Sequence, residues 1–138
     1  MSVLRGVMLL WTALIAAPAE ASGVFDDVSE LKAAVDDVTT AEALHGAISG
    51  WDVSRVDDMS GCCYESGCSG SCAGFFPNAF DALIGGWDTS KVKTMKNAFN
   101  GAAMYDQPLG SWDTSEVTDT YWIFNGATAF NQPDLSGW

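Results

Sequence analysis

The clearest pattern along the chain is a motif in which Trp and Asp are followed by Ser and Val at fixed spacing. It occurs at residues 51–56, 87–92 and 112–117, and a further tryptophan stands at position 138. The last three tryptophans are 25 and 26 residues apart, whereas the first two are 36 apart because of a Cys-rich insert over residues 61–74. Such a period is typical of repeat proteins, in which each unit buries its apolar side chains against its neighbours.

Each repeat unit contains the signals of a turn, a short strand and a short helix. Asp two residues before Ser favours a turn, because a short polar side chain bonds the backbone amides just ahead of it. Residues 90–95 then predict a short strand with Val92 pointing inward, and residues 96–102 are long enough for one or two helical turns ended by Gly101. We therefore predict an α/β solenoid, with short parallel strands on one face and short helical turns on the other.

The units are similar to the repeats of BspA-type leucine-rich repeat surface proteins. The similarity rests on residues 87–117 (WDTSKVKTMKNAFNGAAMYDQPLGSWDTSEV) and 124–138 (FNGATAFNQPDLSGW), and it extends over residues 25–138. It implies a leucine-rich-repeat-like solenoid over residues 51–138, with units that begin at 51, 87 and 112, and an N-terminal helical cap over residues 22–50. It also implies a role in surface display, protein–protein interaction or adhesion. The Cys-rich insert, and Thr120 where the unit usually carries Met, depart from the family's pattern.

The first 21 residues have the features of an export signal. Arg5 supplies a positive charge, residues 7–17 form an uncharged apolar run, and Ala19 and Ala21 are the small residues that a signal peptidase recognises. The run is shorter than the roughly 20 apolar residues of a membrane-spanning helix. We expect residues 1–21 to be a signal peptide and the protein to be secreted or displayed at the cell surface, with no transmembrane segment after removal of the signal. A buried N-terminal helix is the alternative.

The chain is strongly acidic, with 6 Lys and Arg against 18 Asp and Glu and a formal net charge of −12. This charge disfavours nucleic acid and anionic membrane surfaces as partners, because both attract basic proteins. It is compatible with a basic partner or with cation-rich surroundings. Six Trp, seven Phe and three Tyr are too many apolar residues for a disordered chain. We expect a folded protein with an extracellular or surface protein as its partner.

Four cysteines lie in the insert, at Cys62, Cys63, Cys68 and Cys72. Behind an export signal, four cysteines predict two disulfides, for which three pairings exist. A bridge between the adjacent Cys62 and Cys63 is strained, so Cys62–Cys68 with Cys63–Cys72, or the crossed pairing, is favoured. A zinc site is the competing interpretation, because four thiolates can complete a tetrahedron.

The remaining polar residues of interest are the single histidine and the repeated acids. His45 is expected near the end of the capping helix, with Gly46 as its C-cap. Asp52, Asp88 and Asp113 are expected to cap the turns of their units, and a calcium site is the alternative for them. The acids repeat with the unit, whereas a hydrolase needs two carboxyls in distinct environments. We therefore predict no enzyme activity, no cofactor and no catalytic residue, with a calcium- or cation-binding structural component as the alternative function.

The outward positions of the predicted strands are where a repeat protein varies its binding surface. In register, they form columns of side chains that include possible opposite-charge pairs, Lys91 with Glu116 and Asp57 with Lys93. In the last unit, residues 121–123 replace a polar segment with Tyr-Trp-Ile, which predicts either an exposed contact patch or a C-terminal cap packed under the last loop. The predicted partner-binding face comprises Arg55, Asp57, Lys91, Lys93, Glu116, Thr118, Tyr121 and Trp122.

Overall fold

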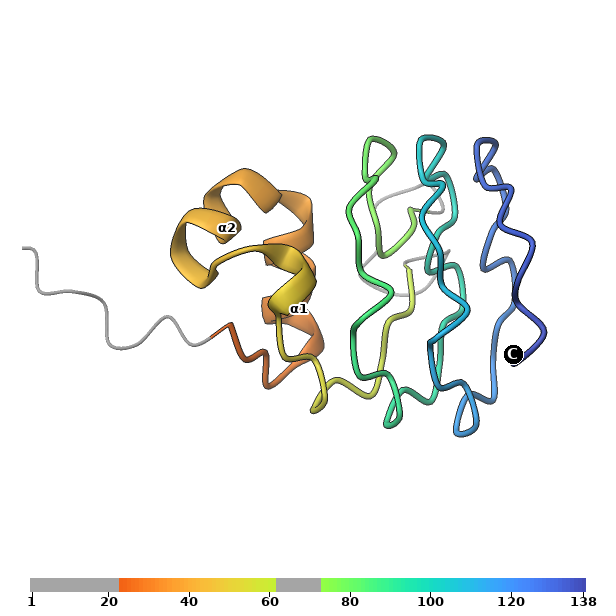
Figure 1. Ribbon diagram of the computed structural model, residues 1–138, viewed down its shortest axis with the longest axis horizontal. Coiled ribbons are helices and arrows are strands. Elements are labelled where there is room, and N and C mark those ends of the chain that lie inside the picture. Colours follow the sequence, from red (N-terminus) through yellow and green to blue (C-terminus); the bar gives the residue numbers. More distant parts are fainter. Residues whose placement is uncertain (1–22, 62–72) are drawn as a thin grey trace, which may run out of the picture.

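The computed structural model describes residues 23–61 and 73–138. The helices lie at its N-terminal end: α1 spans Val28–Asp36, α2 spans Val38–His45 and the 3₁₀ helix η1 spans Ile48–Gly50 (Figure 1). All three fall in the segment for which a helical cap was predicted. None of the helices in the described residues has the length and apolar character needed to cross a membrane.

Short polar side chains define where the two α-helices begin and end. The Asp27 carboxylate accepts hydrogen bonds from the amides of Ser29 (2.8 Å) and Glu30 (2.9 Å) at the start of α1. Asp37 ends α1 and also caps α2. Helix α2 ends at His45 and Gly46 is its C-cap, as predicted; its positive φ of 79° is a conformation that glycine adopts readily.

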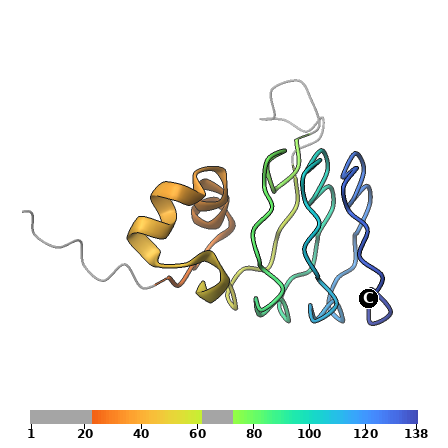
Figure 2. The same cartoon turned by 45° about the horizontal axis from the view of Figure 1, so that its top comes forward.

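The residues after η1 form irregular coils that stack side by side, away from the helices (Figures 1 and 2). One coil contains residues 51–61 and 73–86, and the next two contain residues 87–111 and 112–138. Backbone hydrogen bonds join equivalent positions of neighbouring coils, for example from the Lys93 amide to the Asp57 carbonyl (2.8 Å) and from the Thr118 amide to the Lys93 carbonyl (2.8 Å).

The predicted fold, an α/β solenoid with short parallel strands on one face and helical turns on the other, is wrong. Among the described residues from 51 onward there is no helix and no extended strand, and the coils share only isolated parallel bridges at Asp58–Thr94 and Thr94–Asp119. Each unit begins with a turn. In the second unit this turn ends at Val92, whose amide donates to the Thr89 carbonyl (2.9 Å). Little extended chain is therefore left to pair with the neighbouring coil.

The predicted helical turn at residues 96–102 is also absent, for a related reason. Asn97 has a positive φ of 57°, which interrupts a right-handed helix. The amides of Asn97, Phe99 and Gly101 donate to carbonyls of the next coil rather than to carbonyls four residues back. The neighbouring coil therefore competes successfully with the helix for these donors.

The core consists of aromatic side chains that stack from coil to coil. Phe76 stacks on Phe99 with ring centroids 4.5 Å apart, and Phe99 stacks on Phe124 at 5.4 Å. The tryptophans of the repeat motif form a second column, with Trp51 on Trp87 at 6.3 Å. Each unit thus completes its core only against its neighbours.

The tryptophan column is also held by a repeated hydrogen bond. The indole N–H of Trp51 donates to a backbone carbonyl just after α2. Each later indole N–H donates to a backbone carbonyl a few residues before the preceding tryptophan. The bonds run from Trp51 to Gly46 (2.8 Å), Trp87 to Ile48 (2.9 Å), Trp112 to Ile84 (3.0 Å) and Trp138 to Leu109 (3.1 Å). The motif tryptophan therefore fixes both the packing and the register of the stack.

Candidate protein-binding surfaces

The Asp-x-Ser turns give the exposed charged side chains a repeated, fixed geometry. In each turn the carboxylate accepts a hydrogen bond from the serine amide two residues ahead. The distances are 3.0 Å for Ser54 to Asp52, 3.1 Å for Ser90 to Asp88 and 3.0 Å for Ser115 to Asp113. The prediction that these acids cap their turns is confirmed.

These bonds also favour the ionised form of the aspartates. Hydrogen bonds from the Ser90 side chain and then from its amide hold the pKa of Asp88 below its usual value, and Ser115 does the same for Asp113. No group of three or more His, Cys, Asp or Glu side chains lies in a metal-binding arrangement within residues 23–61 and 73–138. The four cysteines, with their predicted disulfides and the zinc alternative, lie outside the described residues, as does the predicted signal peptide.

Most of the predicted binding face is brought together in one shallow groove. We call Arg55, Asp57, Lys91, Lys93, Glu116 and Thr118 the charged face; all six residues are exposed. Together with Ser90, all of them except Thr118 line a groove of about 490 Å³. The charged face belongs to turns and irregular chain rather than to strands, because Arg55, Lys91 and Glu116 each occupy the turn of their unit.

The charges of this face are only partly paired. Lys93 forms the predicted ion pair with Asp57 (3.0 Å), and Arg55 pairs with Asp26 of the N-terminal segment (2.5 Å). The predicted pair of Lys91 with Glu116 is not formed, and neither residue makes an ion pair with any other part of the chain that the structure describes. Exposed pairs of this kind contribute at most about 1 kcal/mol, so the face is defined by position rather than by strong internal bonds.

Tyr121 and Trp122 stand apart from the charged groove. They are exposed, with 58% and 47% of their surface accessible, and their rings stack at a centroid distance of 5.1 Å. The interpretation that these two residues cap the last loop is therefore wrong, although Ile123 is partly buried. Among residues 23–61 and 73–138, no side chain buries the two rings.

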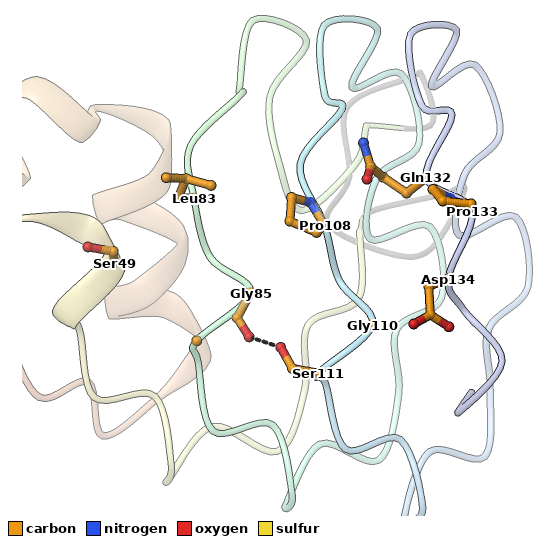
Figure 3. Close-up of a pocket in the computed structure, with 10 residues that line it drawn as sticks. Ser49, Leu83, Gly85, Pro108, Gly110, Ser111, Gln132, Pro133 and Asp134 are labelled. Atoms are coloured by element: carbon orange, nitrogen blue, oxygen red, sulfur yellow. Dashed lines mark hydrogen bonds between the residues drawn. The ribbon is translucent and has the colours of Figure 1, made fainter.

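A second groove, of about 790 Å³, crosses the coils on the stretch that leads into each motif tryptophan (Figure 3). Its floor includes Gly85 and Gly110, where a Cβ atom would lie 2.6 Å from the carbonyl oxygens of Pro108 and Asp134. The Ser111 hydroxyl donates to the Gly85 carbonyl (2.6 Å). These contacts set the distance between coils. The groove was not predicted from the sequence, although a glycine shortly before Trp87 and Trp112 was the available signal.

Gln132 and Asp134, two polar residues of this second groove, have local hydrogen-bond partners. The Gln132 amide donates to the Asp106 carboxylate (2.8 Å), and the Asp134 carboxylate accepts from the Ser136 hydroxyl (2.8 Å). We therefore interpret the groove as a consequence of coil packing rather than as a site with convergent reactive groups.

The described residues define a repeat protein whose coils are joined by columns of aromatic rings and carry charged side chains on their turns. The chain belongs to the family described as "Mycoplasma protein of unknown function, DUF285", which matches residues 29–138. No curated protein matches the chain. A comparison with solved structures likewise finds no match.

Proposed function

We propose that this chain is a secreted or cell-surface protein of the BspA-like type that acts in protein–protein interaction or adhesion, without catalysis, through the charged face. The observation that carries the proposal is the groove in which Arg55, Asp57, Lys91, Lys93 and Glu116 converge from successive units. Charges that vary from unit to unit on a repeated frame are how repeat proteins present an extended binding surface.

The rigidity of the frame supports a binding role. Val56 and Val92, the residues after Arg55 and Lys91, are 1% and 0% exposed, so the turns are anchored in the core. A surface whose backbone is already ordered loses little conformational entropy on binding. Lys91 and Glu116 make no ion pair in the described structure, so a partner does not have to displace an existing salt bridge to reach them.

Binding of the labelled full chain to a panel of purified extracellular-matrix and cell-surface proteins tests this proposal. For any protein that binds, Lys91→Glu is expected to change the affinity about fivefold or more, because it reverses a charge inside the groove; the affinity falls for an acidic partner surface and rises for a basic one. Lys32→Glu is the control, since it makes the same change of charge on α1, outside the groove. Absence of any binding protein, or equal effects of the two variants, contradicts the proposal.

A further inference from the structure

The groove of the charged face offers a partner no apolar side chain. Five of its six lining residues are charged and the sixth is a serine. The apolar residues of the same turns, Val56 and Val92, are buried in the core. The centre of a protein–protein interface is usually apolar and aromatic, with few charged residues. The groove is therefore better suited to a ligand that is itself polar throughout, such as a sugar.

The few basic side chains of the chain are concentrated in this groove. Of the 6 Lys and Arg in the sequence, Arg5 lies outside the described residues, which leaves five. Three of these five, Arg55, Lys91 and Lys93, line the groove. In a protein with a formal net charge of −12, the groove is thus where a negatively charged group finds several cations together.

Only part of this charge is available to a ligand. Arg55 and Lys93 are each engaged in an ion pair, whereas Lys91 and Glu116 form none within the part of the chain that the structure describes. Lys91 and Glu116 occupy equivalent positions of neighbouring coils. Backbone hydrogen bonds, such as that from the Thr118 amide to the Lys93 carbonyl (2.8 Å), hold these coils in register. Chains bonded in this way lie about 5 Å apart. The groove therefore presents one available ammonium and one available carboxylate on a fixed frame.

The acids next to the groove limit how much negative charge a ligand can carry. After the hydrogen bonds from Ser90, the charge of Lys91 also lowers the pKa of Asp88, so the Lys91 ammonium lies near that carboxylate. Asp113 places the equivalent acid in the next coil. A polyanion, such as a sulfated polysaccharide or a nucleic acid, would bring many negative charges against these acids. A ligand with a single carboxylate can pair with Lys91 and avoid most of this repulsion.

We propose that the charged face binds a terminal sugar acid, a hydroxyl-rich ring with one carboxylate, at the end of a glycan carried by a surface protein. Lys91 binds the carboxylate of the sugar, and the Glu116 carboxylate accepts hydrogen bonds from its hydroxyl groups. The groove volume of about 490 Å³ lies within the range of small-ligand sites, roughly 300–1,000 Å³. The charged face keeps its proposed role in adhesion, on which this assignment rests, and it recognises the glycan of the partner rather than its polypeptide surface.

The direct test is retention of the full chain on beads that display sialyllactose, with lactose beads as the neutral control. Display in many copies makes a weak single contact measurable. The protein should be retained on sialyllactose and not on lactose, and free sialyllactose should release it. Beads with heparin, a sulfated polyanion, and with hyaluronan, which carries its sugar acids within a linear chain, should retain less protein. Equal retention on lactose, preference for either polysaccharide, or no retention on any of the beads overturns the proposal.

Three variants identify the residues on which retention depends. Lys91→Gln is expected to weaken binding about tenfold, because it removes the cation that pairs with the sugar carboxylate. Lys32→Gln, the same change on α1 and outside the groove, is expected to leave binding unchanged. Lys91 and Glu116 are exposed, so their variants should fold normally.

Glu116→Ala separates recognition of the sugar from plain attraction of charge. It is expected to weaken binding about threefold, because it removes an acceptor for the sugar hydroxyls. If the net charge of the groove alone decided binding, removal of a negative charge would strengthen it. Stronger binding of Glu116→Ala, or equal losses for the two lysine variants, overturns the proposal.

Sialidase treatment of a surface protein that binds the chain distinguishes failure of this assignment from failure of the proposed function. Treatment is expected to abolish binding. Binding that survives the sialidase but changes in Lys91→Gln would keep the proposed function of the charged face and overturn the sugar acid as its ligand. Binding that responds neither to the sialidase nor to Lys91→Gln would overturn both.

Discussion

Replacement of Tyr105 by Phe is expected to stabilise the protein. The Tyr105 ring is fully buried between Phe80 (5.9 Å) and Phe130 (6.1 Å), so phenylalanine already occupies the equivalent positions in the adjoining coils. Its hydroxyl is buried and has no hydrogen-bond partner in the described structure. An unpaired buried polar group costs about 1–3 kcal/mol, whereas the ring packing is kept in the variant. Tyr105→Phe should therefore raise the free energy of unfolding by about 1 kcal/mol.

Urea unfolding followed by tryptophan fluorescence measures this change, and the melting temperature should rise by about 4 °C. Phe80→Tyr is the matched control, because it adds a second hydroxyl to the same buried column and should destabilise by about 1 kcal/mol or more. Destabilisation by Tyr105→Phe would refute the reasoning, since it would show that the hydroxyl makes a bond that the described contacts lack.

The same pair of proteins gives a pH signature. Burial, and secondarily the nearby Asp81 carboxylate, raises the pKa of Tyr105 well above its usual value of 10.0. Above pH 10 the unfolded state then ionises while the folded state does not, so the stability of the unmodified protein falls as pH rises from the unfolded to the folded pKa. The slope approaches about 1.4 kcal/mol per pH unit. The advantage of Tyr105→Phe should grow over this range; a constant difference would contradict the burial of the hydroxyl.

Three further predictions concern the stack itself. Trp112→Phe should destabilise by about 2 kcal/mol in urea unfolding, because it leaves the Ile84 carbonyl without the indole donor at 3.0 Å; Met104→Ala, at a residue 59% exposed, should change little. Gly85→Ala should destabilise the protein by about 2 kcal/mol or more, because its Cβ would meet the Pro108 carbonyl at 2.6 Å. Gly50→Ala, with open space around the Cβ, should be nearly neutral, and equal effects of the two variants would refute the close approach of the coils. In a carboxyl NMR titration, the pKa values of Asp88 and Asp113 should lie below 3.8. The stability that the ionised carboxylates contribute should be lost as pH falls through their folded pKa. Ser115→Ala should move the pKa of Asp113 back toward 3.8.

The period of the sequence predicted the stacking of equivalent residues but not the secondary structure of each unit. Trp, Val and Phe at fixed positions indicated which side chains are buried, and Val92 is indeed fully buried. The strand and helix predictions failed because propensity describes one unit alone. In the folded protein, the donors of residues 97, 99 and 101 are taken by the next coil, and that is a property of the stack rather than of any one unit.

The candidate surfaces were predictable to a different degree. Repeat register was sufficient to place Lys93 beside Asp57 and to bring Arg55, Lys91 and Glu116 into one groove. The exposure of Tyr121 and Trp122 was only one of two alternatives, because a sequence pattern does not say whether a further layer covers the last unit. The positive φ of Trp122 could not be predicted from its residue type, because a positive φ is usual for asparagine, as at the equivalent Asn97, and not for tryptophan.

Hydrogen exchange of the tryptophan indoles tests the central claim, that each coil is stable only against its neighbours, most directly. The indole donors of Trp87 and Trp112 are bonded to the preceding segment at 2.9 and 3.0 Å, and both side chains are 3% exposed. Their N–H groups should be strongly protected and should exchange with one common free energy that equals that of global unfolding, while the exposed Trp122 exchanges freely. Rapid exchange at Trp87 or Trp112, or a separate opening energy for each, would contradict the interdependence of the coils.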